Sequence, residues 1–133
     1  MLPKISNSDN FKERANKIIP HQTGTFSRSA SHFVEGVYPS YIESANGSHF
    51  TDVDGNEFID YLCGLGPITL GYNYKPVNDA VIEQLTKGIL FSLPHRIEVE
   101  ASELFCQTIP YADKVKFEKT GSNAVTGAVR AAR

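Results

Sequence analysis

The residues whose types and order could do chemistry stand together in "KVKFEKTGSNAVTGAVRAAR", residues 114–133. Alternating apolar residues predict a strand that ends near Lys119, and an alanine-rich helix follows. The first N–H groups of a helix have no partner within it, so together with the positive end of the helix dipole they form an anion site. Gly121 would let a ligand approach this main chain closely, and the hydroxyls of Thr120 and Ser122 would add donors. The pattern suits a phosphate group.

The same residues have a simpler interpretation, in which Thr120 or Ser122 only caps the helix. The turn contains one glycine and no Lys-Ser/Thr pair after it, which excludes a Walker A loop. On the residues alone, the cap and the phosphate site both stay open.

Two other patterns resemble known sites but have the wrong spacing. In "DVDGNE" Asp52, Asp54 and Asn56 alternate as calcium ligands would, but Gly55 comes too early for an EF-hand and the flanks are predicted strands. In "CGLGPITLGY" the third glycine falls five residues after the second, which excludes a dinucleotide fingerprint. Cys63 and Cys106 lie far apart without a nearby histidine, so we expect two buried free thiols and no metal site.

The composition is that of an ordinary globular protein: 133 residues, of which 41% are apolar and 21% charged. The net charge of -2 and the scattered basic residues argue against nucleic acid or an anionic membrane as a partner. No apolar run is long enough to span a membrane, and the N-terminal residues lack the apolar segment of a signal peptide. We therefore expect a cytoplasmic protein.

Apolar spacing predicts a short amphipathic helix over residues 10–19, with Ser8 as its cap and Pro20 as its end. A loop of about fifteen residues follows, and loops of this length are often functional. Strands rich in Tyr, Ile, Phe and Val come next, with hairpin turns at Asn46-Gly47 and Asp54-Gly55. These strands predict a three-stranded antiparallel meander.

Two further helices are predicted before the strand that ends near Lys119. The first runs over residues 76–87 and stops at Gly88, and the second runs over residues 97–109 and is closed by Pro110.

Several motifs occur in the order of one known family: "YIESANGSHFTDVDGNEFIDY", "GLGPITLGY", a helix, "IEVEASELF", "IPYADKVKF" and "TGSNAVTGAVRAAR". From residue 20 to residue 133 the chain resembles the N-terminal third of class III aminotransferases. It is most similar to the glutamate-1-semialdehyde 2,1-aminomutase branch, with its relatives in polysaccharide gene clusters. Because the motifs keep the family's order, together they are more specific than any one of them.

The resemblance implies an α/β fold, the N-terminal portion of a pyridoxal-phosphate-dependent transferase of fold type I. Residues 1–70 would form an N-terminal helix, a loop and the β-meander, as part of the small domain. Residues 71–133 would begin the large cofactor-binding domain and leave it incomplete. We therefore expect an N-terminal fragment of an enzyme that acts on a small amino or carbonyl compound and is a homodimer when complete.

Pyridoxal 5'-phosphate (PLP) is the cofactor that the resemblance implies. In this family a Ser-Gly-Thr-Glu-Ala motif holds the cofactor phosphate at a helix N-terminus, and the matching residues here are Thr120, Gly121, Ser122, Asn123 and Ala124. The main-chain N–H groups of Gly121 and Ser122 would bind the phosphate, with a hydroxyl from Thr120 or Ser122. Asn123 replaces the Glu common in the family, which removes a charge beside the cofactor and leaves the specific activity open.

Three residues are implied in substrate binding. The stretch "TGTFSRSAS" matches the region in which the aminomutase meets the substrate carboxylate through a Ser and an Arg, so Ser27 and Arg28 are the candidates. The forked guanidinium of an arginine suits a carboxylate. The alignment slips by a residue or two here, so the alternative that Arg28 is an ordinary surface residue stays open. Leu65 stands where the aminomutase often carries a Trp lining the pocket, which indicates a different substrate.

No residue of the chain is a candidate for the catalytic role. In this family the Schiff-base lysine, and the acid that keeps the cofactor ring nitrogen protonated, lie well beyond the phosphate motif, and so beyond Arg133. We expect a PLP-dependent transaminase or 2,1-aminomutase as the full-length protein, and an inactive chain on its own. The alternative is a truncated, non-catalytic remnant that at most binds phosphate or a partner subunit.

Overall fold

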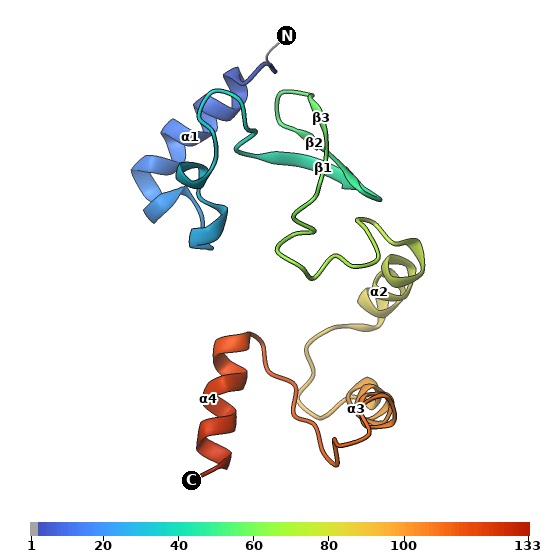
Figure 1. Ribbon diagram of the computed structural model, residues 1–133. Coiled ribbons are helices and arrows are strands. Elements are labelled where there is room, and N and C mark those ends of the chain that lie inside the picture. Colours follow the sequence, from blue (N-terminus) through green and yellow to red (C-terminus); the bar gives the residue numbers. More distant parts are fainter. Residues whose placement is uncertain (1–2) are drawn as a thin grey trace. The chain divides into compact units, whose positions relative to one another are not determined.

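The computed structural model describes residues 3–133, in two compact units that divide between Thr86 and Lys87 (Figure 1). The predicted domain boundary between residues 70 and 71 concerns the complete fold and stays a prediction. The elements in chain order are α1 (Ser6–Ile18), β1 (Ile42–Asn46), β2 (His49–Asp52), β3 (Glu57–Ile59), α2 (Lys75–Lys87), α3 (Arg96–Thr108) and α4 (Gly121–Ala131).

Both predicted hairpins form, and they build an antiparallel sheet in the order β1-β2-β3. Gly47 and Gly55, in the two turns, have positive φ angles of 56° and 84°, which hairpin turns of this kind require. Phe50 is buried, pairs with Phe58 across β2 and β3, and stacks on it with ring centroids 5.3 Å apart. The sheet centre therefore supplies one of the two buried apolar residues found in the described part of the first unit, and Ala15 of α1 is the other.

Helix α1 begins at Ser6, earlier than predicted, because the turn between β2 and β3 caps it. Asp54 Oδ1 accepts a hydrogen bond from the main-chain N–H of Asn7 at 2.7 Å, and Asp54 Oδ2 accepts one from that of Ser8 at 2.9 Å. The prediction of Ser8 as the cap is wrong, because Ser8 lies within the helix and is buried. The cap comes instead from a residue far along the chain, which local spacing cannot reveal.

The predicted long loop after α1 is folded into three short 3-10 turns. They span Pro20–Gln22, Phe26–Arg28 and Ala30–His32. Ser29, between the second and third, is buried and its Oγ lies 2.9 Å from that of Ser31. The loop is therefore a defined structure, and it carries Ser27 and Arg28.

The acidic residues of "DVDGNE" serve the hairpin itself. Asp52 is only 1% exposed, and its Oδ1 accepts hydrogen bonds from the main-chain N–H of Asp54 at 3.0 Å and of Asn56 at 2.7 Å. Its Oδ2 accepts a third from the Asn56 side chain at 2.7 Å. Donors of the turn thus satisfy the carboxylate, as buried charge requires. Among residues 3–133 no group of three or more His, Cys, Asp or Glu side chains could hold a metal ion.

Both cysteines are free thiols, but the expectation that they are buried is wrong. Cys63 is exposed in the glycine-rich turn after β3, and Cys106 in α3 is half-buried.

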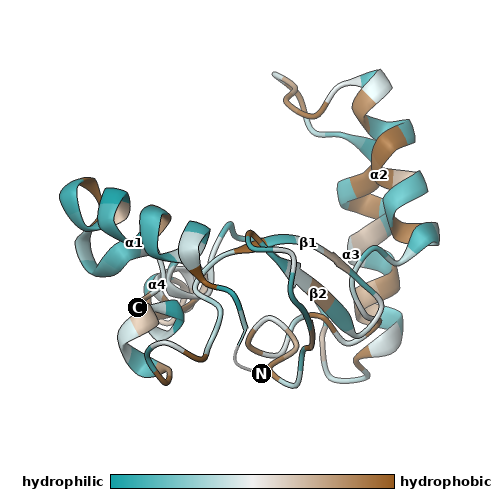
Figure 2. Cartoon of the chain, turned by 90° about the horizontal axis from the view of Figure 1, so that it is seen from above, coloured by the Kyte–Doolittle hydropathy of each residue, from teal (hydrophilic) through white to brown (hydrophobic). Residues whose placement is uncertain are grey.

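Helices α2 and α3 form within a residue or so of their predicted bounds, and Gly88 after α2 has a positive φ of 102°. Figure 2 shows apolar residues, coloured brown, along both helices. Those of α2 are half exposed or more: Val77, Val81, Ile82 and Leu85. No helix in the described part of the chain is both long and apolar enough to cross a membrane.

The predicted strand ending near Lys119 is wrong. Residues 114–118 contain neither helix nor strand and lead directly into α4. A strand is defined by hydrogen bonds to a neighbour, and the sheet in the described residues consists of β1, β2 and β3 alone. The alternation of Val115 and Phe117 is therefore not accompanied by strand pairing in the described residues.

Acid should weaken the start of α1. Burial raises the pKa of Asp54, but hydrogen bonds from the Asn7 and Ser8 N–H groups outweigh it and bring the pKa below its usual 3.8. The capping contribution is therefore complete above pH 3.8 and is lost as the pH falls through the lower folded-state pKa. We expect the protection of the amide hydrogens in the first turn of α1, measured relative to exchange of the unfolded chain at the same pH, to fall over that range.

The substitution Asp54→Ala should produce the same loss of amide protection in the first turn of α1 at neutral pH. Glu13→Ala, which removes an exposed acid from the same helix, is the matched control and should leave the first turn protected. Equal exchange in wild type and Asp54→Ala would contradict the assignment of the cap.

Candidate functional site

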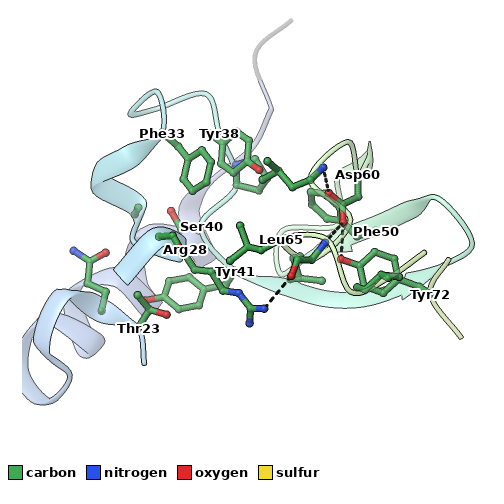
Figure 3. Close-up of a pocket in the computed structure, with 18 residues that line it drawn as sticks. Thr23, Arg28, Phe33, Tyr38, Ser40, Tyr41, Phe50, Asp60, Leu65 and Tyr72 are labelled. Carbon is green, nitrogen blue, oxygen red and sulfur yellow. Dashed lines mark hydrogen bonds between the residues drawn. The ribbon is translucent and has the colours of Figure 1, made fainter. Parts of the chain in front are cut away.

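A cavity of about 440 Å³ lies in the first unit, between the loop after α1, the meander and the glycine-rich segment that follows β3 (Figure 3). Ser27, Arg28 and Leu65, the three residues proposed from the sequence to bind substrate, all line it. They come from segments far apart in the chain, so the fold brings them together. Their role in binding stays a prediction.

Arg28 is the cationic group of this cavity. Its Nη2 donates a hydrogen bond to the carbonyl oxygen of Gly64 at 3.3 Å. None of the ion pairs found in the described residues includes Arg28. Because a guanidinium has five N–H donors, most of them remain available, and the arrangement suits an anionic ligand.

Aromatic side chains form much of the remaining wall. Phe33 and Tyr38 stack in parallel with ring centroids 4.0 Å apart, and Phe50 and Tyr41 also line the cavity. Burial raises the pKa of Tyr38, with a smaller contribution from the negative charge of Asp60. A ligand here would meet one cation within a mainly apolar surface.

Asp60 is the acidic group of the cavity, and its oxygens are already occupied. Oδ1 accepts from the main-chain N–H of Leu62 at 2.8 Å, while Oδ2 accepts from that of Gly64 at 3.3 Å and from the Tyr72 hydroxyl at 2.7 Å. Burial would raise the pKa of Asp60, but the bond from Tyr72 and those from the main chain lower it below its usual value. The carboxylate is therefore a fixed acceptor within the wall.

The main chain after Asp60 is unusual, because positive φ angles occur in succession at residues 63–66. Cys63 and Leu65 have φ angles of 48° and 72°, which side chains other than glycine rarely adopt. Gly64 has a φ of 60°, at which a larger residue is strained, and a Cβ atom there would lie 2.6 Å from Ile68 Cδ1, so the Ile68 side chain would also have to move. Leu65 consequently faces the cavity from a constrained turn.

Sequence reasoning missed Asp60 and Tyr72. The available signal was an acid placed directly after a predicted strand and a tyrosine at the far end of a glycine-rich turn. Nothing local indicates that the two side chains meet, because the contact depends on how the segment folds back onto the meander.

The other candidate site is the start of α4, in the second unit. Thr120 is the N-cap, and its Oγ1 accepts from the main-chain N–H of Asn123 at 3.2 Å. The capping interpretation is therefore confirmed, but it uses only one of the free N–H groups. Those of Gly121 and Ser122 stand before the first intrahelical bond, Ala124 N–H to the Thr120 carbonyl.

The space around Gly121 is open, because a Cβ atom there would meet nothing within 4 Å. An anion could therefore approach the Gly121 and Ser122 N–H groups. The Thr120 hydroxyl keeps its hydrogen for donation, since its oxygen is the acceptor of the cap. These features fit a phosphate group, although the role of Thr120, Gly121, Ser122 and Asn123 stays a prediction.

Tyr72 should ionise late. Burial, then the hydrogen bond to Asp60 and its charge, raise the pKa of Tyr72 from 10.0 to about 12. The contribution of this contact to folding stability is therefore complete below pH 10 and is lost as the pH rises towards 12. The difference in tyrosinate absorbance between wild type and Tyr72→Phe should show a transition near pH 12. Tyr111→Phe, at an exposed position, should leave this late transition in place, and its absence from wild type would contradict the contact.

Residues 32–133 match the model of the family described as aminotransferase class-III. Glutamate-1-semialdehyde 2,1-aminomutase 2 of Lachnoclostridium phytofermentans is 39% identical over 129 residues, which are 97% of this chain and 30% of that protein. The 3-aminobutyryl-CoA aminotransferase of Cloacimonas acidaminovorans is 37% identical over 131 residues, 98% of this chain and 31% of that protein.

A solved structure described as a transaminase with PLP bound superposes with a TM-score of 0.87 at 28% identity, over 98% of this chain and 30% of that chain. The chain thus spans about 30% of the length of the relatives that it matches. Its mixed α/β architecture with the three-stranded meander matches the N-terminal part of PLP-dependent transaminase structures. The chain belongs to the class-III aminotransferase family.

Proposed function

We propose that this chain is the N-terminal part of a PLP-dependent enzyme that transfers an amino group to, or within, a small carbonyl compound. The observation that carries the proposal is that Ser27, Arg28 and Leu65 line one cavity in which Arg28 has no carboxylate partner among the described residues. Arg28 would bind the substrate carboxylate through its free N–H groups, with Ser27 beside it. Leu65 and the aromatic wall would contact the rest of the substrate.

The start of α4 would hold the cofactor phosphate. The N–H groups of Gly121 and Ser122, with the helix dipole behind them, would neutralise part of its charge, and hydroxyls from Thr120 and Ser122 would donate to its oxygens. When bound, PLP supplies the carbonyl that takes up the amino group and a ring that acts as an electron sink. Asn123 contributes no charge here, in contrast to the family's glutamate.

The residue that would bind the cofactor covalently has no candidate in this chain. Lys114, Lys116 and Lys119 lie in the segment without helix or strand before α4, and Lys116 is ion-paired with Glu118 at 3.1 Å. We therefore expect the 133-residue chain alone to lack activity. The enzyme that we propose includes sequence beyond these residues and, as in the family, two subunits.

Aminomutase and transaminase are the two candidate activities, because one relative is named for each. The protein from the complete reading frame, purified with PLP, should show the visible absorbance of bound cofactor and act on one of two substrates. Conversion of glutamate 1-semialdehyde to its 1-amino isomer would identify the aminomutase. Transfer of the amino group of a 3-aminobutyryl thioester to a 2-oxo acid would identify the transaminase. Failure to bind PLP would contradict the proposed function, and a reading frame that stops at residue 133 would favour the non-catalytic remnant.

The phosphate site can be tested separately through Ser122. No hydrogen bond involves the Ser122 Oγ in the described structure, so Ser122→Ala removes a phosphate donor without loosening α4. Hydrogen bonds to charged groups contribute about 1.5–3 kcal/mol, so the dissociation constant for PLP should rise about tenfold or more while the melting temperature of the apoprotein stays unchanged. Ser102→Ala removes the same hydroxyl from α3, where it bonds only to the Glu98 carbonyl of its own helix, and should leave PLP affinity unchanged. Equal affinity in both variants would overturn the assignment of Ser122.

A further inference from the structure

We propose that Asp60 is a positioning residue of the substrate cavity, because its carboxylate helps to fix the segment 61–71 and, through residue Gly64, the direction of the Arg28 guanidinium. This inference deepens the proposed function and rests on it. We call residues 61–71 the cavity loop.

The ends of the cavity loop are tied to the meander. The Asp60 N–H donates to the Ser48 carbonyl at 2.8 Å. Tyr72 and Gly47 exchange both main-chain hydrogen bonds, at 2.8 and 2.9 Å. Gly71 lies so close to this bridge that a Cβ atom on it would be 3.0 Å from the Gly47 carbonyl oxygen. The Asp60–Tyr72 side-chain bond then joins the two ends directly, as Figure 3 shows.

The carboxylate also holds the interior of the cavity loop. It accepts the N–H groups of Leu62 and Gly64, which flank Cys63 and lead into the run of positive φ angles. Residues such as Cys63 and Leu65 adopt such angles only when surrounding interactions impose them. The bonds to Asp60 contribute to this, because they hold the Tyr61–Leu62 and Cys63–Gly64 peptides. Main-chain bonds within the loop contribute as well, from the Leu65 N–H to the Leu62 carbonyl at 2.9 Å and from the Ile68 N–H to the Cys63 carbonyl at 3.1 Å.

Gly64 passes this constraint to Arg28. Its N–H donates to Asp60 Oδ2 at 3.3 Å, and its carbonyl oxygen accepts from Arg28 Nη2, also at 3.3 Å. The bond to Gly64 is the one hydrogen bond of the Arg28 side chain in the described structure. Without Asp60, Gly64 would lose the bond that holds its N–H, and the carbonyl that orients the guanidinium would be held only through the neighbouring Leu65 N–H, which donates to the Leu62 carbonyl at 2.9 Å.

Asp60 itself has no direct part in binding the substrate. Its two oxygens already accept three hydrogen bonds, and it forms no ion pair with Arg28 in the described residues. It therefore leaves the positive charge of Arg28 available while fixing where that charge lies. Misplacement of a binding group weakens substrate capture, so the expected effect is on KM.

The test uses Asp60→Asn in the protein from the complete reading frame. Asparagine keeps the size and one acceptor oxygen, but its amide nitrogen cannot accept a hydrogen bond. The side chain can then no longer accept hydrogen bonds through two oxygens, as the carboxylate does. With glutamate 1-semialdehyde or the 3-aminobutyryl thioester, whichever the wild type converts, KM should rise about tenfold with kcat within about twofold. Hydrogen exchange of a peptide that covers the cavity loop should accelerate. Asp79→Asn removes the same charge from an exposed ion pair with Lys75 and should change neither.

A double-mutant cycle with Arg28→Gln separates positioning from general stability. If Asp60 acts through Arg28, Asp60→Asn should raise KM little further in the Arg28→Gln background. Full additivity of the two effects, or unchanged exchange of the cavity loop in Asp60→Asn, would overturn the inference. A raised KM in Arg28→Gln alone, with wild-type KM in Asp60→Asn, would overturn the role of Asp60 and keep the proposed role of Arg28. An unchanged KM in Arg28→Gln would overturn both.

Discussion

Carboxylates that accept main-chain N–H groups hold the first unit together. Among the residues that the structure describes there, the buried apolar ones are Ala15 and Phe50, so apolar burial alone gives this unit little rigidity. Asp52 fixes the turn between β2 and β3, Asp54 caps α1 from that turn, and Asp60 closes the cavity loop. Each acid compensates donors that a turn or a helix end would otherwise leave unpaired.

These long-range contacts mark the limit of what the sequence could predict. The hairpins at Gly47 and Gly55 and the helices α2 and α3 carry local signals, namely turn glycines, apolar spacing and Pro or Gly at their ends, and they form as predicted. The cap of α1 and the closure of the cavity loop carry no such local signal, because in the sequence Asp54 and Asp60 resemble ordinary polar loop residues. The strand ending near Lys119 failed for a related reason, since its pairing depends on a neighbour and not on its own alternation.

The candidate site divides in the same way. Thr120 and Gly121 could be identified from the order of residue types, because a helix cap and an open N-terminus are local features. Ser27, Arg28 and Leu65 came from resemblance, and only the fold brings them to one cavity. Asp60 had neither signal. The role that we propose for it rests on residue Gly64, whose N–H donates to the acid and whose carbonyl oxygen accepts from the arginine.

Under the proposed function, the two anion sites differ for a physical reason. A cofactor phosphate stays in place and carries a permanent charge, so rigid main-chain N–H groups at Gly121 and Ser122 suit it. A substrate carboxylate must arrive and leave, which favours a side chain such as Arg28 that keeps most of its donors free. A long arginine has many rotamers, however, and fixing one of them lowers the entropy lost on binding. Holding Arg28 through Gly64 and Asp60 gives that preorganisation without a carboxylate that would compete with the substrate.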